Sequence, residues 1–194
     1  KIDYNKVLVV DADTIVHPNC PNFFDLTEDN ELGCVVNEGC YEWVARDMNN
    51  WSTNFFDNMY LPQWEYFNSG FMLLSKKHKP VIKKLLEWYH NNASNINLSQ
   101  NEFKTSTEQG PLNFLLRKWG VDIKLLPSCY NTQDLFKKNT LNKGYKAWSD
   151  EFLFFKAGWI YHFNAIPHDL QQYGYHGECG DWIKLTYEKL YKNA

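Results

Sequence analysis

The feature that most constrains this chain is a short apolar run that ends in two carboxylates. The run is Val7–Val10, and Asp11-Ala12-Asp13 follows it directly. A continuous stretch of β-branched and aliphatic residues predicts a buried strand of a parallel sheet. Because residues i and i+2 of a strand point to the same side, both carboxylates are expected to face one point in space.

The paired carboxylates have two interpretations. Two close like charges repel each other unless a cation lies between them, and hard ions such as Mg²⁺ and Mn²⁺ prefer oxygen ligands. Ligands of open α/β sheets also bind beyond the carboxyl ends of strands. Asp11 and Asp13 therefore indicate a metal–phosphate site, and the alternative is that they only cap a turn, as Asp often does.

Composition excludes several classes of protein. The 194 residues, 44% of them hydrophobic, predict a single domain over residues 1–194. A net charge of −3 without a basic block argues against a nucleic-acid partner, and no stretch is apolar enough to span a membrane. The five cysteines contain no Cys-x-x-Cys pair, which argues against a disulfide scaffold or a zinc site. Aromatic residues make up 17% of the chain, and a surplus of them near a cleft would suit sugar rings.

The start of the chain leads to an expectation about its extent. It begins at Lys1 without a methionine and enters a core-like strand within a few residues. We therefore expect a fragment or a processed piece, from which a targeting segment could be missing. A cytoplasmic location is favoured, and the Golgi lumen is the alternative if a preceding segment carries an anchor.

A second polar motif lies in the middle of the chain. Phe71–Leu74 predicts a buried strand, which is entered through Asn68-Ser69-Gly70. Glycine lets a backbone approach a ligand closely, and the Asn and Ser side chains supply short hydrogen-bonding groups. Pro80 then opens an amphipathic helix, and residues 91–107 are polar and are expected to form a loop.

Glu108-Gln109 lies just before a further helix. Leu112, Leu115, Leu116 and Trp119 have helical spacing, and Pro111 suits a first turn. The acidic residue and the amide are therefore expected at the helix mouth, beside its free N–H groups. Such groups often do no more than complement the helix dipole.

Two long polar segments show little periodicity. Residues 37–64 are polar and aromatic, and they are interpreted either as a substrate-binding loop or lid, or as a surface excursion that contains short helices. Residues 132–150 are rich in Lys and Asn and are expected to form a loop. Trp159–Phe163 predicts a last short strand, and residues 181–191 predict a closing helix.

Four short motifs occur in a fixed order, and together they resemble glycosyltransferase family 8, a family of metal-dependent GT-A enzymes. The likeness runs from Val7 to about His168. The matching residues are Asp11-Ala12-Asp13, Phe67-Asn68-Ser69-Gly70, Glu108-Gln109 with Leu112-Asn113 after it, and His162-Phe163. The resemblance implies an α/β fold with a mixed sheet flanked by helices.

The resemblance also implies roles for these residues. Asp11, Asp13 and His162 would hold Mn²⁺ (or Mg²⁺), which bridges the diphosphate of a nucleotide sugar; carboxylate and imidazole suit Mn²⁺. Asn68, Ser69 and Gly70 would lie beside the donor sugar. Glu108 would bind sugar hydroxyls, and Gln109 would lie beneath the anomeric carbon with its amide oxygen facing it.

The chain departs from the family in two places. The family's late His-x-x-Gly-x-x-Lys-Pro reads His162, Ala165, His168 and Asp169 here, so His168 would have to replace a lysine on phosphate. Family members also carry a nucleotide-binding half before the Asp-x-Asp strand. The resemblance therefore implies that this chain is the C-terminal part of such a domain, the side that holds metal and acceptor, with the other half missing or supplied elsewhere.

The implied reaction is transfer of a hexose from a nucleoside diphosphate sugar, most simply a UDP-sugar, to a hydroxyl of a glycan or protein acceptor, with retention at the anomeric carbon. Front-face attack is favoured because a neutral amide is a poor nucleophile, and Glu108 as a nucleophile or base is the alternative. Two rival functions are a non-catalytic module that binds glycans or proteins, and a nucleotidyltransferase or metal phosphohydrolase. A nucleotidyltransferase or metal phosphohydrolase would not account for the order of the four motifs.

Overall fold

A computed structural model describes residues 4–141, 152–167 and 179–192. The chain forms two compact units: the first contains residues up to 10 together with 24–126, and the second contains residues 11–23 together with those from 127 onward. The helices and strands, in chain order, are β1 Lys6–Val10, β2 Thr14–Val16, β3 Glu31–Val36, α1 Tyr41–Phe55, β4 Phe67–Ser75, α2 Lys79–Phe103, α3 Gln109–Lys118, β5 Asp122–Leu125, α4 Leu135–Leu141, β6 Ile160–His162 and α5 Cys179–Tyr187.

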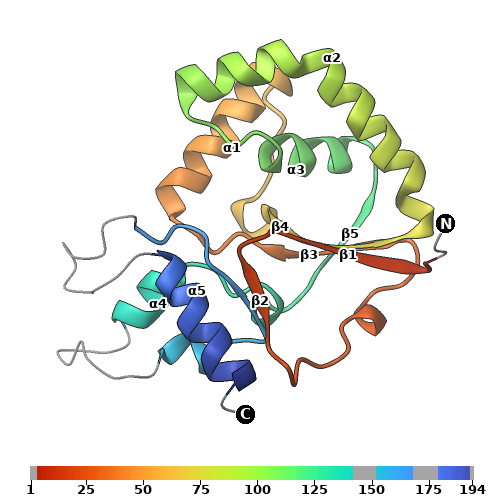
Figure 1. Cartoon of the computed structure of the whole chain (residues 1–194). Helices are drawn as coiled ribbons and strands as arrows, with labels where there is room; N and C mark the ends of the chain where they lie inside the picture. The colour runs from red at the N-terminus through yellow and green to blue at the C-terminus, as the bar shows by residue number, and fades with distance from the viewer. Residues whose placement is uncertain (1–3, 142–151, 168–178, 193–194) are drawn as a thin grey trace. The chain divides into compact units, whose positions relative to one another are not determined.

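The first unit is built on a four-stranded sheet in the order β1-β4-β3-β5. β4 pairs antiparallel with both β1 and β3, whereas β3 pairs parallel with β5. Helices α1, α2 and α3 lie on one face of this sheet (Figure 1). The mixed sheet with flanking helices confirms the predicted α/β class.

β1 corrects the prediction made for Val7–Val10. The run does form a strand, but it is antiparallel to β4 and lies at the edge of the sheet. Val7, Val9 and Val10 are 37%, 43% and 37% exposed, so the predicted burial is wrong. An apolar run identifies a strand but does not place it within a sheet, and only an interior strand has its neighbours on both sides. The prediction for Phe71–Leu74 is confirmed, because β4 is an interior strand with three of those four residues buried.

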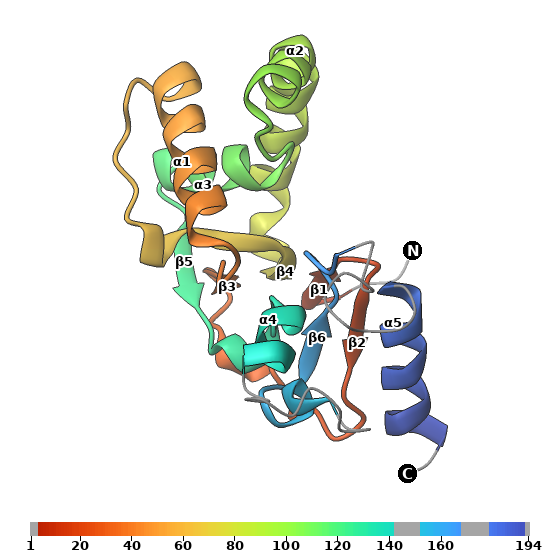
Figure 2. The ribbon, with the colours of Figure 1, turned by 90° about the vertical axis from the view of Figure 1, so that its left-hand side faces the viewer.

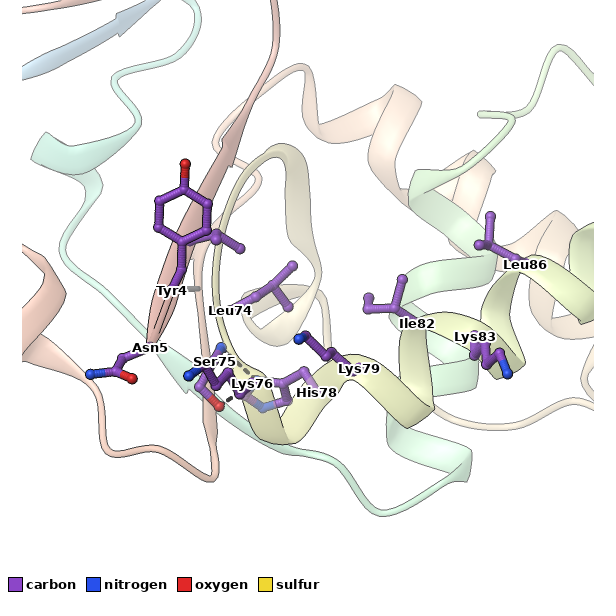
Figure 3. A pocket seen from close by; sticks show the side chains of 11 residues that line it. Tyr4, Asn5, Leu74, Ser75, Lys76, His78, Lys79, Ile82, Lys83 and Leu86 are labelled. Carbon is purple, nitrogen blue, oxygen red and sulfur yellow. Dashed lines mark hydrogen bonds between the residues drawn. The ribbon is translucent and has the colours of Figure 1, made fainter. Parts of the chain in front are cut away.

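An apolar pocket of about 390 Å³ lies beside the exposed strand (Figure 3). Val7, Leu74, Ile82 and Leu86 supply its apolar lining, with Lys76, Lys79 and Lys83 among its other lining residues. No carboxylate lines this pocket. It therefore lacks the negatively charged oxygen ligands that would favour a divalent cation over the nearby lysines.

The segment 37–64 contains a long helix, so the interpretation as a surface excursion was right about helical content. Val44, Asp47, Met48 and Trp51 are the buried residues of α1, at the spacing i, i+3, i+4 and i+7. One of the four members is an aspartate, which interrupts the apolar stripe in the sequence. Hydrogen bonds to its carboxylate make that burial possible, as the site geometry below shows.

Helix α2 is longer than predicted. It begins at Lys79, with Pro80 in its first turn, and continues to Phe103. Most of the segment predicted as a loop, residues 91–107, is therefore helical. Ile96 and Ser99 are buried along this polar stretch, which shows that packing on one narrow face sustains the helix where the composition favours a loop.

The close approach of α3 to α1 depends on a glycine. Gly110 in the first turn of α3 faces the indole of Trp51, which is fully buried. A Cβ atom at position 110 would lie 2.0 Å from Cδ1 of Trp51, well inside van der Waals contact. The two helices can therefore pack at this distance only if residue 110 has no side chain.

We expect Gly110→Ala to lower the free energy of unfolding by about 1–3 kcal/mol, because the added methyl group would overlap the buried indole of Trp51. Chemical denaturation followed by circular dichroism measures the change. Gly180→Ala in α5 is the matched control, since no atom lies within 4 Å of its added Cβ. It should be neutral or stabilising by about 0.4–1 kcal/mol. Equal stability of the two variants would contradict the packing described here.

The second unit contains a two-stranded antiparallel sheet of β2 and β6. Its core is aromatic and includes Phe154, Tyr161, Phe163 and Trp182. α5 lies beside β2 (Figure 2). The prediction for Trp159–Phe163 is confirmed as β6, whereas the predicted loop 132–150 contains α4, and residues 142–151 lie outside the described part.

The structure also bears on the sequence-based expectations about membrane spans and cysteines. No described helix is both long enough and apolar enough to cross a membrane. Cys20, Cys34, Cys40 and Cys129 are free cysteines. Burial raises the pKa of the Cys34 thiol to about 12, so this group stays protonated and unreactive near neutral pH.

Candidate functional site

The two Asp-x-Asp carboxylates lie in the short connection between β1 and β2. Thr14 begins β2, and its hydroxyl donates to the backbone oxygen of Asp11 at 2.8 Å. Thr14 pairs with His162 of β6, and the Phe163 N–H donates to the Asp13 oxygen at 2.9 Å. Strand pairing therefore brings a histidine from late in the chain next to both aspartates.

The three side chains form one cluster. His162 Nε2 lies 3.3 Å from Asp11 Oδ2 and 3.2 Å from Asp13 Oδ1, and the three candidate ligand atoms lie within 4.8 Å of one another. The imidazole is buried, whereas both carboxylates are about half exposed. The predicted convergence of Asp11, Asp13 and His162 is confirmed.

The chemistry of this cluster fits a divalent cation. His162 Nε2 is buried and has no hydrogen-bond partner in the described chain. The neighbouring His162 holds the pKa of the Asp11 carboxyl below its usual value, so Asp11 is ionised at neutral pH despite partial burial. One imidazole and two carboxylates are a ligand set that suits Mn²⁺ or Mg²⁺.

Asn131 is a part of this site that sequence reasoning missed. Its Oδ1 lies 3.2 Å from Nδ1 of His162, and the residue is fully buried. An amide oxygen can only accept, so this contact places the imidazole proton on Nδ1 and leaves Nε2 with a lone pair for a metal. No local sequence pattern marks Asn131, which lies just before the predicted loop 132–150; only the structure shows that Asn131, Thr132 and Gln133 are all buried.

A second cluster brings β4 and α3 together. Glu108 is the N-cap residue of α3; its side chain makes no capping hydrogen bond, and its Oε1 instead accepts a hydrogen bond from Ser69 Oγ at 3.0 Å. Gln109 Oε1 accepts from Asn68 Nδ2 at 3.0 Å and from the Ser69 N–H at 3.1 Å. The prediction that Glu108 and Gln109 lie at a helix mouth beside Asn68 is confirmed.

Backbone donors fix the orientation of both amides in this cluster. The Ser69 N–H can only donate, so the Gln109 atom that faces it is oxygen. The Gly70 N–H donates to Asn68 Oδ1 at 2.9 Å, which turns the Asn68 NH₂ group toward Gln109. The Gln109 oxygen thus already accepts two hydrogen bonds, whereas the sequence-based expectation needed it free to face a sugar.

Glu108 and Gln109, at the start of α3, differ in solvent exposure. Gln109 is 4% exposed, and its amide nitrogen is buried without a hydrogen-bond acceptor in the described chain. Glu108 is exposed, and Thr107 donates to its second oxygen. Of the pair, Glu108 is the residue that a bound molecule can reach.

Asp47 anchors this cluster from α1, and sequence reasoning missed it as well. Its carboxylate accepts from the Ser106 N–H at 2.6 Å, from Ser106 Oγ at 2.7 Å and from the Tyr66 hydroxyl. Ser106 Oγ in turn accepts from the Gly110 N–H at 2.8 Å. Burial, followed by the Asp47 charge, raises the pKa of Tyr66 well above its usual value, so the phenol remains a hydrogen-bond donor.

Not every predicted site residue can be placed. His168 lies outside the described residues. The metal cluster belongs to the second unit, and Asn68, Ser69, Gly70, Glu108 and Gln109 belong to the first. That the two clusters face each other stays a prediction.

Comparison with known protein families decides the identity of the chain. Residues 2–166 match the family described as glycosyl transferase family 8. The chain belongs to glycosyl transferase family 8. This membership agrees with the resemblance drawn from the four motifs.

Two other comparisons add less. A search of curated proteins found no match. Among solved structures, the chain is similar to the apo structure of WbbM, a bifunctional glycosyltransferase, with 14% identity and a TM-score of 0.39. That similarity covers 84% of this family 8 chain and 29% of the WbbM chain, so this chain spans less than a third of the structure it matches.

Proposed function

We propose that this family 8 protein transfers a hexose from a nucleoside diphosphate sugar, with UDP as the nucleotide, to a hydroxyl of a glycan or protein acceptor, and that the transfer depends on Mn²⁺ or Mg²⁺. The observation that carries the proposal is the cluster of Asp11, Asp13 and His162. A solvent-accessible pair of carboxylates with an imidazole whose Nε2 is unpartnered suits an ion that must also contact a substrate.

The protein's own residues prepare this site. Asp11, Asp13 and His162 would hold the ion, and Asn131 would keep the His162 proton on Nδ1. Bound Mn²⁺ would supply Lewis-acid stabilisation of the charge that grows on the leaving diphosphate. His168 remains a candidate for contact with phosphate, which it could donate to when protonated or suitably oriented.

The second cluster would hold the donor sugar. We propose that Glu108, as the accessible carboxylate, contacts sugar hydroxyls and stabilises positive charge at the anomeric carbon. Gln109 would hold Asn68 and Ser69 in position, because its oxygen accepts from both. Ser69 and Gly70 would line the sugar pocket from β4.

The proposed reaction retains the anomeric configuration. The bond from the anomeric carbon to the diphosphate oxygen breaks, and the acceptor oxygen bonds to that carbon on the same face. The acceptor proton passes to the leaving phosphate oxygen. This route requires no nucleophile from the protein, which suits an amide at position 109.

The proposal is tested by metal binding and turnover measured on the same protein. Calorimetry should detect Mn²⁺ binding, and release of UDP from UDP-glucose, UDP-galactose or a UDP-N-acetylhexosamine should require the ion. Proton NMR of the transferred sugar would report the anomeric outcome. Metal binding without turnover of any donor would instead favour the non-catalytic glycan- or protein-binding alternative, and an inverted product would contradict front-face transfer.

A further inference from the structure

A cavity in the first unit shares no residue with either cluster described above. It lies between α1 and the segment that follows it, which turns back and runs alongside the helix (Figure 2). Its volume is about 530 Å³, and Met48, Leu61 and Phe114 are buried residues among those that line it. A space of this size accommodates a small molecule or a short oligomer.

Three aromatic side chains on this cavity are unusually exposed. Tyr41, Tyr60 and Trp64 line it and are 70%, 78% and 69% exposed. Large aromatic surfaces left in water are costly and mark binding sites when they gather around a hollow. Flat rings of this kind suit the C–H faces of sugar rings, which stack on them.

The rest of the lining is polar but neutral. Asn49, Thr53, Asn58 and Gln63 contribute amide and hydroxyl groups, and the side chains of these four residues make no hydrogen bond within the described chain. None of the lining residues carries a charge. Uncharged donors and acceptors match the hydroxyls of a neutral saccharide, whereas a phosphate, a nucleotide or an acidic glycan would lack a cationic partner.

A tight turn precedes the part of the chain that lines the cavity. Asp57 and Asn58 have φ angles of 51° and 58°, in the left-handed region, which Asp and Asn adopt more readily than other non-glycine residues. Ser52 stabilises the turn, because its hydroxyl donates to the Met59 oxygen at 2.8 Å and its own backbone oxygen accepts from the Asn58 N–H at 3.0 Å.

From these observations we infer that the cavity bounded by Tyr41, Tyr60 and Trp64 binds a neutral oligosaccharide. The aromatic side chains provide stacking surfaces, and the unpaired amides and hydroxyl provide hydrogen bonds to sugar hydroxyls. This binding site goes beyond the proposed transfer reaction and does not require the metal cluster. It deepens the earlier expectation for residues 37–64 by naming the ligand class and the residues that contact it.

The test is binding of the fluorescently labelled protein to an array of immobilised neutral hexose and N-acetylhexosamine oligosaccharides, with uronic-acid oligosaccharides beside them. We expect binding to at least one neutral glycan. Tyr60→Ala and Trp64→Ala should each weaken it at least about tenfold, the loss expected when an aromatic anchor is removed. Tyr4→Ala is the matched control, because Tyr4 is also an exposed tyrosine of the first unit, 53% exposed, but does not line the cavity.

The outcomes separate this inference from the proposed function. Asp13→Asn should bind the glycan as the parent protein does, even if it transfers no sugar. No binding to neutral glycans, binding to uronic-acid glycans alone, or equal binding by the parent and both cavity variants would overturn the inference. Because Tyr60 and Trp64 are so exposed, their variants should keep the parent's melting temperature, which shows that any loss of binding is local.

Discussion

Replacing Asp13 with asparagine is expected to abolish Mn²⁺ binding and to lower kcat by about 10³ or more, because Lewis-acid stabilisation is worth several kcal/mol and each 1.36 kcal/mol is about tenfold in rate. Asp13 supplies one of two carboxylates that lie 3.2–3.3 Å from the buried His162 Nε2. An amide has the same shape but lacks the negative charge. Calorimetry with Mn²⁺ and a UDP-release assay measure the two effects.

Two further variants make this prediction sharper. Asp57→Asn is the control, since it removes an exposed aspartate at a left-handed position that asparagine also adopts, and it should leave both readouts unchanged. Asn131→Ala should weaken Mn²⁺ binding by about 10–100-fold, the effect expected when the partner that orients a ligating histidine is lost. Undiminished Mn²⁺ binding by Asp13→Asn would remove the proposed metal site.

Glu108→Gln is expected to lower kcat by about 10²–10³ and to leave Mn²⁺ affinity unchanged, because it removes a charge that stabilises only the transition state. The substituted amide still offers an oxygen to Ser69 Oγ, so the helix mouth keeps its geometry. Glu102→Gln on α2, an exposed glutamate with no hydrogen bond or ion pair in the described chain, is the matched control. Steady-state kinetics with the best donor provides the measurement.

Gln109→Ala is the contrasting variant at the same helix mouth. It leaves the Ser69 N–H and the Asn68 amide without their acceptor, so it should destabilise the protein by about 1–3 kcal/mol as well as slow turnover. Gln109→Glu keeps an acceptor for both donors and should recover the lost stability. A full rate in Glu108→Gln would rule out the role proposed for that carboxylate, and a covalent sugar adduct on Glu108 would show that it is the nucleophile.

The amino-acid sequence by itself determined the parts of this protein that depend on local pattern and motif order. Asp11 and Asp13 at the end of an apolar run indicated a metal site, and the resemblance to the family added His162; the structure contains the cluster of all three. The order of the four motifs predicted the family that comparison confirmed. Pro111 predicted that Glu108 and Gln109 lie at the start of a helix, because an α-helix tolerates proline only in its first turn.

Only the tertiary structure decided which surfaces are covered and which polar groups are paired. Val7–Val10 has the composition of an interior strand but lies at the edge of its sheet, because burial depends on neighbouring strands from elsewhere in the chain. Asp47 on α1 is a buried carboxylate that Ser106 and Tyr66 stabilise from far along the chain, which no local pattern indicates. The same holds for Asn131 and for the oxygen of Gln109. A hydrogen bond between residues distant in sequence forms only after the chain has folded, so the roles of these polar groups could be assigned only from the folded structure.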